Sequence, residues 1–305
     1  HKPEEVVVKI NKIGLIGMGL MGQAFIKNLV KAQIHVQGFD TDQKRMSQLK
    51  DVGGTPLDSP HLVGKDVNFV LTSLPNSTIA RDVFFGEGGL ADNNYRDLIV
   101  CDTTTSRPED SEEIAGELSN FGIHFLDTAV SGTSAMAEVG DLVIIAGGPK
   151  EIYDKAIPIL NTFSRASYYM GPSGSGARTK LVINLVLAGN RLSLAEGLVL
   201  GEKSGLNLDS LLAVVKDGAC SSKTMSDKGP KMIDGDFKTQ SLVTNVLKDS
   251  RLMLEQGQKF GSPMLMTNIW SQLMQASEEA GYGEKDVTSF IEILRGMAGL
   301  KSRID

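Results

Sequence analysis

Three glycines with a fixed spacing stand where a buried strand would end. Gly17, Gly19 and Gly22 form a G-x-G-x-x-G pattern that follows an apolar run and precedes apolar residues at helical spacing. In such a strand, turn and helix, the first glycine allows a tight turn, the second lets the backbone approach a pyrophosphate, and the third lets helix and strand pack closely. The N–H groups at the start of the helix favour phosphate. The pattern predicts a dinucleotide site formed by Gly17, Met18, Gly19, Leu20, Met21 and Gly22.

An acidic residue lies at the expected distance from this turn. A second apolar segment, residues 34–39, ends at Asp40, which is 18 residues beyond Gly22. Near this spacing an acid contacts the ribose 2′-OH of a dinucleotide. A carboxylate accepts hydrogen bonds from a free 2′-OH and repels a 2′-phosphate, so we expect NAD to be preferred over NADP. Lys44 and Arg45 follow and could soften this exclusion.

Removing hydride from a carbon that bears a hydroxyl also needs a proton acceptor. The four histidines are His1, His35, His61 and His124, and none is predicted to lie at a domain junction. Lys180 follows a glycine-rich segment at the start of a long apolar helix, where we expect it to face a cleft between domains.

A lysine that is partly desolvated in such a cleft can act as acid or base. Asn184 lies four residues beyond Lys180, on the same face of the predicted helix. The alternative is that Lys180 is an ordinary solvated lysine at a helix start.

Strand-like and helix-like segments alternate along the first half of the chain. This alternation predicts an α/β Rossmann-type doubly wound sheet domain over residues 1–172. Beyond it almost no strand signal remains, and we expect an all-α C-terminal domain over residues 173–305 that begins with a long inter-domain helix. Strands are expected at 34–39, 67–74, 98–101, 123–126, 142–146 and 166–170, and helices at 43–52, 78–85, 108–121, 181–200, 208–215, 244–260 and 263–280.

Composition narrows the classes of partner. The net charge is −6 and the pI near 5.4, which argues against nucleic acid or an anionic membrane as the main partner. We see no uncharged apolar run long enough to span a bilayer. Two cysteines without a C-x-x-C cluster indicate a reducing compartment and no metal site, so we expect a cytoplasmic protein. The chain starts at His1, so a targeting peptide would lie outside this sequence.

Four patches together resemble the β-hydroxyacid dehydrogenase family, which includes 3-hydroxyisobutyrate dehydrogenase. The resemblance runs from Ile13 to about Gly299. Its patches are the glycine turn, D-T-A-V-S-G-T at 127–133, G-S-G-A-R-T-K at 174–180 with Asn184, and L-K-D at 247–249.

The resemblance implies a role for individual residues. Lys180 matches the acid/base lysine, and Asn184 matches an asparagine that positions substrate and lysine. Ser131 and Gly132 match the segment that binds the substrate carboxylate, and Thr133 beside them replaces the family's second glycine. Further expected contacts with the cofactor are Leu74, Pro75 and Thr105, which match residues lining its groove, and Lys248, which matches a lysine at the nicotinamide end.

We therefore expect an NAD-dependent oxidoreductase that interconverts a small 3-hydroxy carboxylic acid and its semialdehyde or keto acid. One alternative is a reductase of a short semialdehyde, of the glyoxylate, succinic, tartronate or sulfolactaldehyde type. A non-catalytic dinucleotide-binding protein of the same fold is another. The length disfavours a decarboxylating 6-phosphogluconate dehydrogenase, and the presence of Lys180 disfavours an imine reductase.

The apolar content of the helical half predicts assembly. Its long helix has more hydrophobic surface than one sheet contact would bury, so we expect a homodimer or homotetramer. The residues that suggest this are Leu181, Leu185, Leu192 and Leu200.

Overall fold

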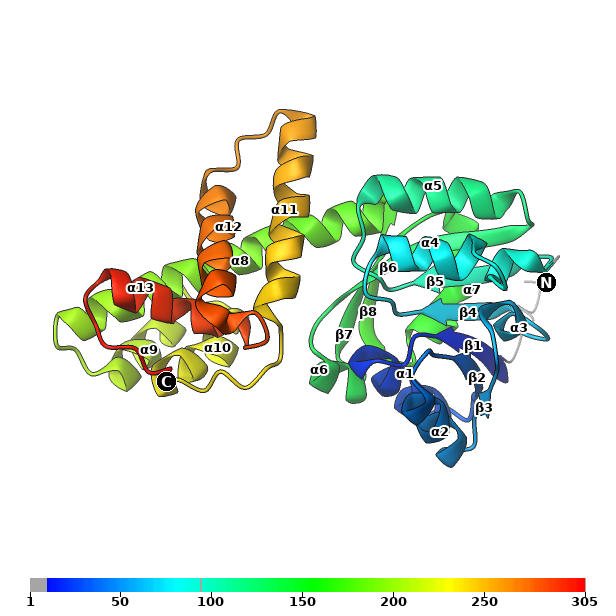
Figure 1. Ribbon diagram of the computed structural model, residues 1–305, viewed down its shortest axis with the longest axis horizontal. Coiled ribbons are helices and arrows are strands. Elements are labelled where there is room, and N and C mark those ends of the chain that lie inside the picture. The colour runs from blue at the N-terminus through cyan, green and yellow to red at the C-terminus, as the bar shows by residue number, and fades with distance from the viewer. Residues whose placement is uncertain (1–9, 94, 305) are drawn as a thin grey trace, which may run out of the picture. The chain divides into compact units, whose positions relative to one another are not determined.

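The computed structural model describes residues 10–93 and 95–304, and the chain forms two compact units, His1–Lys180 and Leu181–Asp305 (Figure 1). The expected boundary between residues 172 and 173 precedes the helix α8 (Ser175–Lys203), whereas the two units meet inside that helix. The α/β fold followed by a helical region confirms the predicted fold class.

One mainly parallel sheet carries the first unit. Within the described residues it has eight strands in the order β3-β2-β1-β4-β5-β6-β7-β8. The first six run parallel to one another, β7 is antiparallel to β6, and β8 is parallel to β7. The strands are β1 (Lys12–Ile16), β2 (His35–Phe39), β3 (Thr55–Pro56), β4 (Phe69–Thr72), β5 (Leu98–Asp102), β6 (Ile123–Ser131), β7 (Leu142–Gly147) and β8 (Ser164–Gly171).

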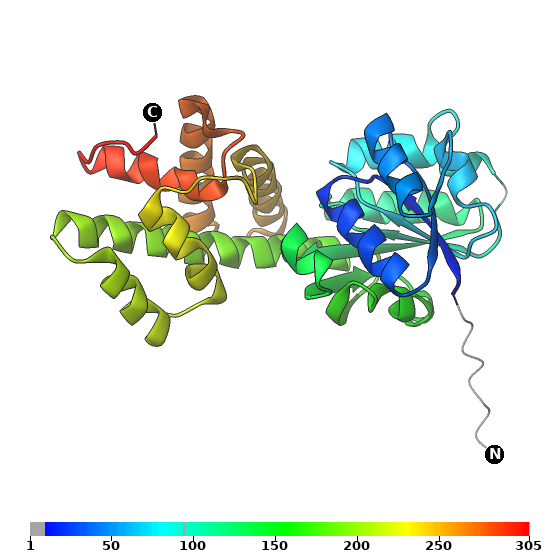
Figure 2. The ribbon, with the colours of Figure 1, turned by 90° about the horizontal axis from the view of Figure 1, so that it is seen from below.

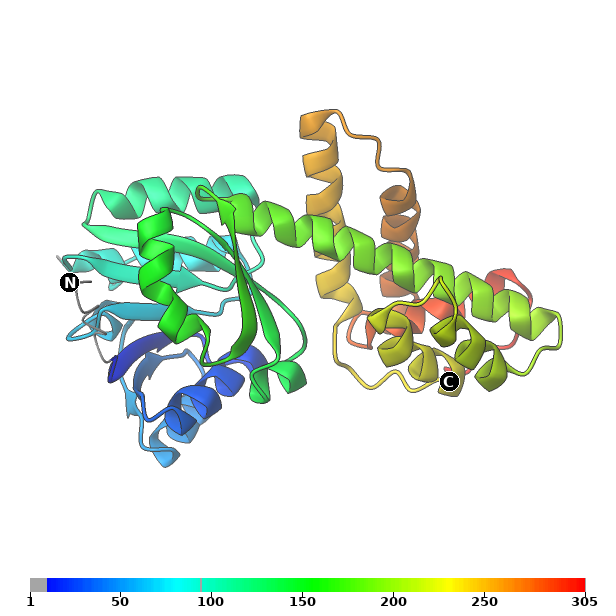
Figure 3. The same cartoon turned by 180° about the vertical axis from the view of Figure 1, so that it is seen from behind.

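Helices cover both faces of this sheet. The helices are α1 (Leu20–Lys31), α2 (Gln43–Asp51), α3 (Pro60–Val63), α4 (Ser77–Phe85), α5 (Pro108–Ser119), α6 (Ser134–Glu138) and α7 (Lys150–Leu160), with a 3-10 turn η1 (Leu90–Asp92). One hydrophobic cluster joins the sheet to α1, α2 and α7, and another joins it to α3, α4 and α5. Figure 3 shows α7, in green, lying in front of the sheet. Buried apolar strands between two helical layers are what a doubly wound sheet requires.

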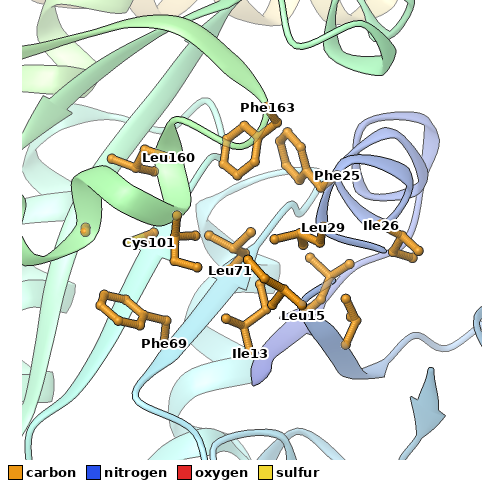
Figure 4. Packing of buried hydrophobic residues seen from close by; sticks show 14 of the residues in the cluster. Ile13, Leu15, Phe25, Ile26, Leu29, Phe69, Leu71, Cys101, Leu160 and Phe163 are labelled. Atoms are coloured by element: carbon orange, nitrogen blue, oxygen red, sulfur yellow. The ribbon is translucent and has the colours of Figure 1, made fainter. Parts of the chain in front are cut away.

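Aromatic packing anchors α1 in the first cluster. The rings of Phe25 and Phe163 have centroids 4.4 Å apart and planes tilted by 38°. Figure 4 shows the two side chains next to each other. Both rings are fully buried. This contact fixes α1, and with it the glycine turn that begins α1, against the sheet.

A single row of register partners crosses the sheet at one edge. Phe39, Ile16 and Thr72 are consecutive partners in β2, β1 and β4. The row then continues through β5, β6, β7 and β8 by way of Asp102, Asp127, Gly147 and Gly171. The strands β2, β1, β4 and β5 therefore bring their carboxyl-terminal ends to one line, which crosses β6 at its middle residue, Asp127. The chain leaves β8 on the same line and enters α8.

The second unit is helical. Its long helix α8 runs beside several shorter helices (Figure 2). The rings of Trp270 and Phe290, both in the hydrophobic cluster of this unit, have centroids 4.9 Å apart. The other helices are α9 (Leu208–Asp217), α10 (Lys223–Asp234), α11 (Val243–Phe260), α12 (Leu265–Ser277), a π-helical turn η2 (Glu278–Tyr282), a 3-10 turn η3 (Val287–Phe290) and α13 (Ile291–Met297).

The helix α8 is longer than the sequence suggested. It begins at Ser175, inside the segment that looked like a glycine-rich linker, and ends at Lys203. By length and composition alone it could cross a membrane. The core helix of a soluble protein meets the same criteria, so the expectation of no membrane partner stays a prediction.

Candidate active site

The glycine turn has the geometry that its spacing predicts. Gly17 follows β1 with a φ of +89°, and a Cβ there would overlap with the carbonyl oxygen of Ser73. A Cβ on Gly22 would overlap with the carbonyl oxygen of Gly17, so this glycine lets α1 close onto the turn. A Cβ on Gly19 would have only Arg45 Nη1 within 4 Å, at 4.0 Å. The backbone at Gly19 therefore faces open space.

The start of α1 is suited to an anion. Gly19 is its N-cap and contributes no side-chain cap, and the first turn contains no acidic residue. Of the turn's other residues, Met18 is fully buried, Leu20 is exposed and Met21 packs against the core. Uncapped N–H groups at a helix start beside open space are suited to a pyrophosphate.

Asp40 binds the glycine turn itself. Its Oδ2 accepts the N–H of Met18 at 2.6 Å and lies 3.3 Å from Nη1 of Arg45, and its Oδ1 accepts the N–H of Asp42 at 2.8 Å. The residue is buried. A carboxylate has about four acceptor positions, so a ribose hydroxyl remains compatible with these contacts. The sequence analysis did not foresee that Asp40 also holds the turn, and its contact with the ribose stays a prediction.

The segments after β4 and β5 are fixed by a buried carboxylate. Oδ1 of Asp102 accepts the hydroxyls of Thr72 at 2.7 Å and Thr104 at 2.6 Å, and Oγ1 of Thr104 accepts the N–H of Leu74 at 3.2 Å. Burial raises the pKa of Asp102. The expected groove residues Leu74, Pro75 and Thr105 stand directly after these strand ends. Sequence reasoning assigned no role to Asp102.

These residues gather where the order of the sheet reverses. The chain moves outward from β1 through β2 to β3, then crosses back to β4 on the other side of β1. In open α/β sheets, ligands bind outside the carboxyl ends of the strands at such a switch point. The glycine turn, Asp40 and Leu74 all follow strands at this edge. His35 and His124, in contrast, lie at the amino-terminal ends of β2 and β6.

The expected carboxylate site follows β6. Ser131 is the last residue of that strand, and Gly132 has a φ of +139°, which disfavours a side chain. Oγ1 of Thr133 accepts the N–H of Met136 at 3.3 Å and so caps α6. Nδ2 of Asn28 in α1 donates to the carbonyl oxygen of Ala137 at 2.7 Å, which connects α6 to α1. Thr133 therefore has a structural role that its sequence position did not reveal.

Lys180 and Asn184 lie one turn apart on α8. Nδ2 of Asn184 donates to Oδ2 of Asp249 on α11 at 3.1 Å, and Nζ of Lys248 lies 3.5 Å from Oδ1 of the same carboxylate. Asp249 thus links two expected site residues of the second unit. Asp249 belongs to the L-K-D motif at 247–249, but no role was predicted for it.

No group of three or more His, Cys, Asp or Glu side chains that could hold a metal ion is found among the described residues. The polar groups gathered at the sheet edge are instead hydroxyls, carboxylates and backbone N–H groups. Backbone N–H groups and hydroxyls of this kind can bind phosphate or carboxylate groups.

Two family models match nearly the whole chain. One, described as the NAD binding domain of 6-phosphogluconate dehydrogenase, matches residues 12–171. The other, described as the NAD-binding domain of NADP-dependent 3-hydroxyisobutyrate dehydrogenase, matches residues 174–294.

The similarity to named relatives extends over almost the full length of both proteins. The chain is 31% identical to 2-(hydroxymethyl)glutarate dehydrogenase of Eubacterium barkeri, over 95% of this chain and 96% of that protein. It is 30% identical to 3-sulfolactaldehyde reductase of Escherichia coli K12, over 96% and 98%. A solved 3-hydroxyisobutyrate dehydrogenase of Mycobacterium tuberculosis with L-serine superposes with a TM-score of 0.85 at 25% identity, over 94% of this chain and 100% of that one.

Proposed function

Since this chain belongs to the β-hydroxyacid dehydrogenase family, we propose that it uses NAD to interconvert a small 3-hydroxy carboxylic acid and its semialdehyde or keto acid. Similar proteins are named as dehydrogenases and reductases of hydroxyl or aldehyde groups, and this one is an oxidoreductase that uses a nicotinamide dinucleotide. Our proposal adds three points to this: the preference for NAD over NADP, the class of substrate, and the roles of single residues.

The observation that carries the proposal is the uncapped start of α1 beside open space at Gly19, at the switch point of the sheet. This end of the helix fits a pyrophosphate. When bound, the nicotinamide ring accepts or donates the hydride. The chain's own residues bind the two ligands and move the proton.

In the proposed reaction, Nζ of Lys180 removes the proton of the substrate hydroxyl during oxidation and returns a proton to the carbonyl oxygen during reduction. The hydroxyl of Ser131 and the backbone N–H groups at Gly132 bind the substrate carboxylate, because charge-assisted hydrogen bonds are strong. Asn184 and Lys248 both contact the carboxylate of Asp249 within the second unit, and the roles proposed for them are those that the family resemblance implies.

A reductase of a short semialdehyde is the second candidate. The relative named 3-sulfolactaldehyde reductase favours it, since its 30% identity nearly equals that of the dehydrogenase from Eubacterium barkeri. Thr133 adds bulk beside the proposed carboxylate site, so substrate choice is the property that sequence similarity transfers least.

A panel of 3-hydroxy acids and short semialdehydes tests the proposal. Each compound is offered with NAD or NADH, and the absorbance of NADH is followed. We expect turnover of at least one small 3-hydroxy acid. Turnover of semialdehydes alone would support the second candidate, and binding of NADH with no turnover of any compound would support a non-catalytic protein.

We also propose a cytoplasmic homodimer or homotetramer. Of the leucines that suggested assembly, Leu181 and Leu192 are buried within the fold, whereas Leu200 is 70% exposed. Val182 and Val186 on the same helix are also more than half exposed. Several exposed apolar residues on one helix favour a subunit interface. Cys101 and Cys220 are free thiols, as in a reducing compartment.

A further inference from the structure

Asp127 connects the strand β6 to the start of α8. Its Oδ1 accepts the N–H of Gly174 at 2.8 Å, and its Oδ2 accepts the N–H of Ala177 at 2.8 Å. Both donors stand before or within the first turn of α8, where N–H groups have no partner inside the helix. The first backbone bond there runs from the N–H of Arg178 to the carbonyl oxygen of Gly174. Asp127 therefore caps α8 from a strand about 50 residues away in the chain.

The surroundings of this carboxylate leave no room for adjustment. A Cβ on Gly147 would lie 2.7 Å from Oδ1 of Asp127. A Cβ on Gly176 would lie 2.5 Å from the carbonyl oxygen of Asp127 and 2.6 Å from that of Ile145. The glycines at the start of α8 are thus needed for close packing against β6 and β7. They do not form the loose linker that their composition suggests.

Two segments of the proposed active site leave from this point. Ser131 lies four residues beyond Asp127 in β6, and Lys180 lies three residues beyond Ala177 in α8. A short stretch of β6 separates Ser131 from Asp127. A short stretch of α8 separates Lys180 from Ala177, whose N–H donates to Asp127. A shift of the α8 start would therefore move Nζ of Lys180 with respect to Ser131 and Gly132.

We propose that Asp127 is a positioning residue, which sets the place of Lys180 with respect to the carboxylate site at Ser131 and Gly132. This inference rests on the proposed function, because it takes Lys180 as the acid/base group. Misplacing a reacting group by about 1 Å can cost about a hundredfold in rate, so a change of this cap is expected to act mainly on kcat.

The test replaces Asp127 by Asn. The amide has the same shape but only one acceptor, so it must turn its NH2 toward the N–H of either Gly174 or Ala177. We expect kcat to fall about tenfold to hundredfold, with NADH affinity by fluorescence within about twofold of wild type. Asn207→Ala is the matched control, because it removes another N-cap, in α9, that accepts the N–H of Ser210 at 2.8 Å. It should leave kcat unchanged.

A double substitution separates positioning from a general loss of stability. If Asp127 acts through Lys180, then Asp127→Asn should lower the residual kcat of a Lys180→Ala enzyme by no more than about twofold. The same loss in both backgrounds would overturn the inference. So would a kcat of Asp127→Asn within twofold of wild type when Lys180→Ala has lost most of its activity.

If Lys180 is not the acid/base group, so that the proposed function itself fails, Lys180→Ala would keep its activity. This outcome differs from every result that overturns the positioning role of Asp127 alone.

Gly147→Ala is a second variant for the case that Asp127→Asn does not fold. Its added methyl crowds Oδ1 of Asp127 and the N–H of Gly176 while keeping the carboxylate. A lowered kcat with retained NADH binding would again support the inference, and an unchanged kcat would overturn it.

Discussion

Single residues in this protein serve both chemistry and position. Asp40 was expected to meet a ribose, and it also holds the N–H of Met18 in the glycine turn. No role was predicted for Asp249, and its carboxylate contacts both Asn184 and Lys248. Carboxylates thus hold other residues of the proposed site in place, a buried one at Asp40 and a partly buried one at Asp249. At the scale of single residues, the predictions concern the proton that Lys180 transfers and the 2′-phosphate that Asp40 repels.

Replacing Lys180 with Ala should lower kcat by roughly two to four orders of magnitude, the range expected when a positioned acid/base is lost. NADH binding should persist, because the glycine turn belongs to β1 and α1. Lys180→Arg should restore little, since arginine stays protonated near neutral pH. Steady-state kinetics with a NADH titration by fluorescence measures both. A Lys180→Ala enzyme with more than about a tenth of the wild-type kcat would point to another proton carrier.

The ratio of kcat/KM for NAD to that for NADP should exceed one, because the Asp40 carboxylate repels a 2′-phosphate. Arg45 lies 3.3 Å from Asp40 and partly offsets this charge. Arg45→Ala should therefore increase the ratio. Lys44→Ala on the same helix is the control, since no ion pair with Asp40 is found for it among the described residues. A wild-type ratio of one or less would contradict the role given to Asp40.

At the scale of elements, the start of α8 is held closely against the sheet of the first unit. It joins β6, β7 and the segment after β8 through one carboxylate and several close backbone contacts. Two predictions about this junction can be tested through the stability of the folded protein. One concerns how that stability depends on pH, and the other how it responds to an added methyl group.

Burial raises the pKa of Asp127 to about 6, although the N–H groups of Ala177 and Gly174 oppose the shift. A raised pKa means that the folded protein binds this proton more tightly than the unfolded chain. The stability from this group is therefore present below the unfolded pKa of about 4 and is lost as pH rises through about 6. The loss is about 2 to 3 kcal/mol at full effect.

Urea unfolding of wild type and Asp127→Asn between pH 4 and 7 measures this. The free energy of unfolding of wild type should fall relative to that of the variant as pH rises. A difference between the two proteins that stays constant across this range would show that Asp127 does not titrate there.

Two glycines of α8 should respond to alanine in opposite ways. Gly197 has nothing within 4 Å of an added Cβ, so Gly197→Ala should stabilise the helix by about 0.5 to 1 kcal/mol. Gly176→Ala should destabilise by about 1 to 3 kcal/mol or more, because the methyl meets two carbonyl oxygens of the sheet. Thermal unfolding of the pair decides it. Equal effects of the two substitutions would mean that the junction is not tightly packed.

At the scale of the whole molecule, the exposed apolar residues of α8 predict a stable oligomer. Light scattering at micromolar concentration should give a mass of at least twice 32.7 kDa. Val186→Asp, at an exposed position, should weaken the assembly, whereas Ser193→Asp, at an exposed polar position of the same helix, should not. A stable monomer for the wild type would overturn the expectation.

The sequence alone predicted what local patterns encode. The glycine turn, the alternation of buried strands with helices and the change to helices in the second half all follow from spacing over a few residues. Helical segments whose pattern is interrupted by proline or glycine were not predicted. No helix was expected at α7 or α10, which contain Pro158 and Pro230, because a proline inside a helix obscures its signal. The start of α8 was misplaced by six residues for a similar reason, since glycines there indicated a linker.

Only the tertiary structure decided which carboxylates hold the site. Asp127 meets Ala177 across 50 residues of chain, Asn184 meets Asp249 across 65, and Thr72 meets Asp102 across 30. Such pairs leave no periodic trace in the sequence, because each depends on which strands and helices become neighbours. Residue types and short spacings therefore determined the kind of chemistry. The order of the strands, and the close approach that glycine allows between them and α8, determined where that chemistry takes place.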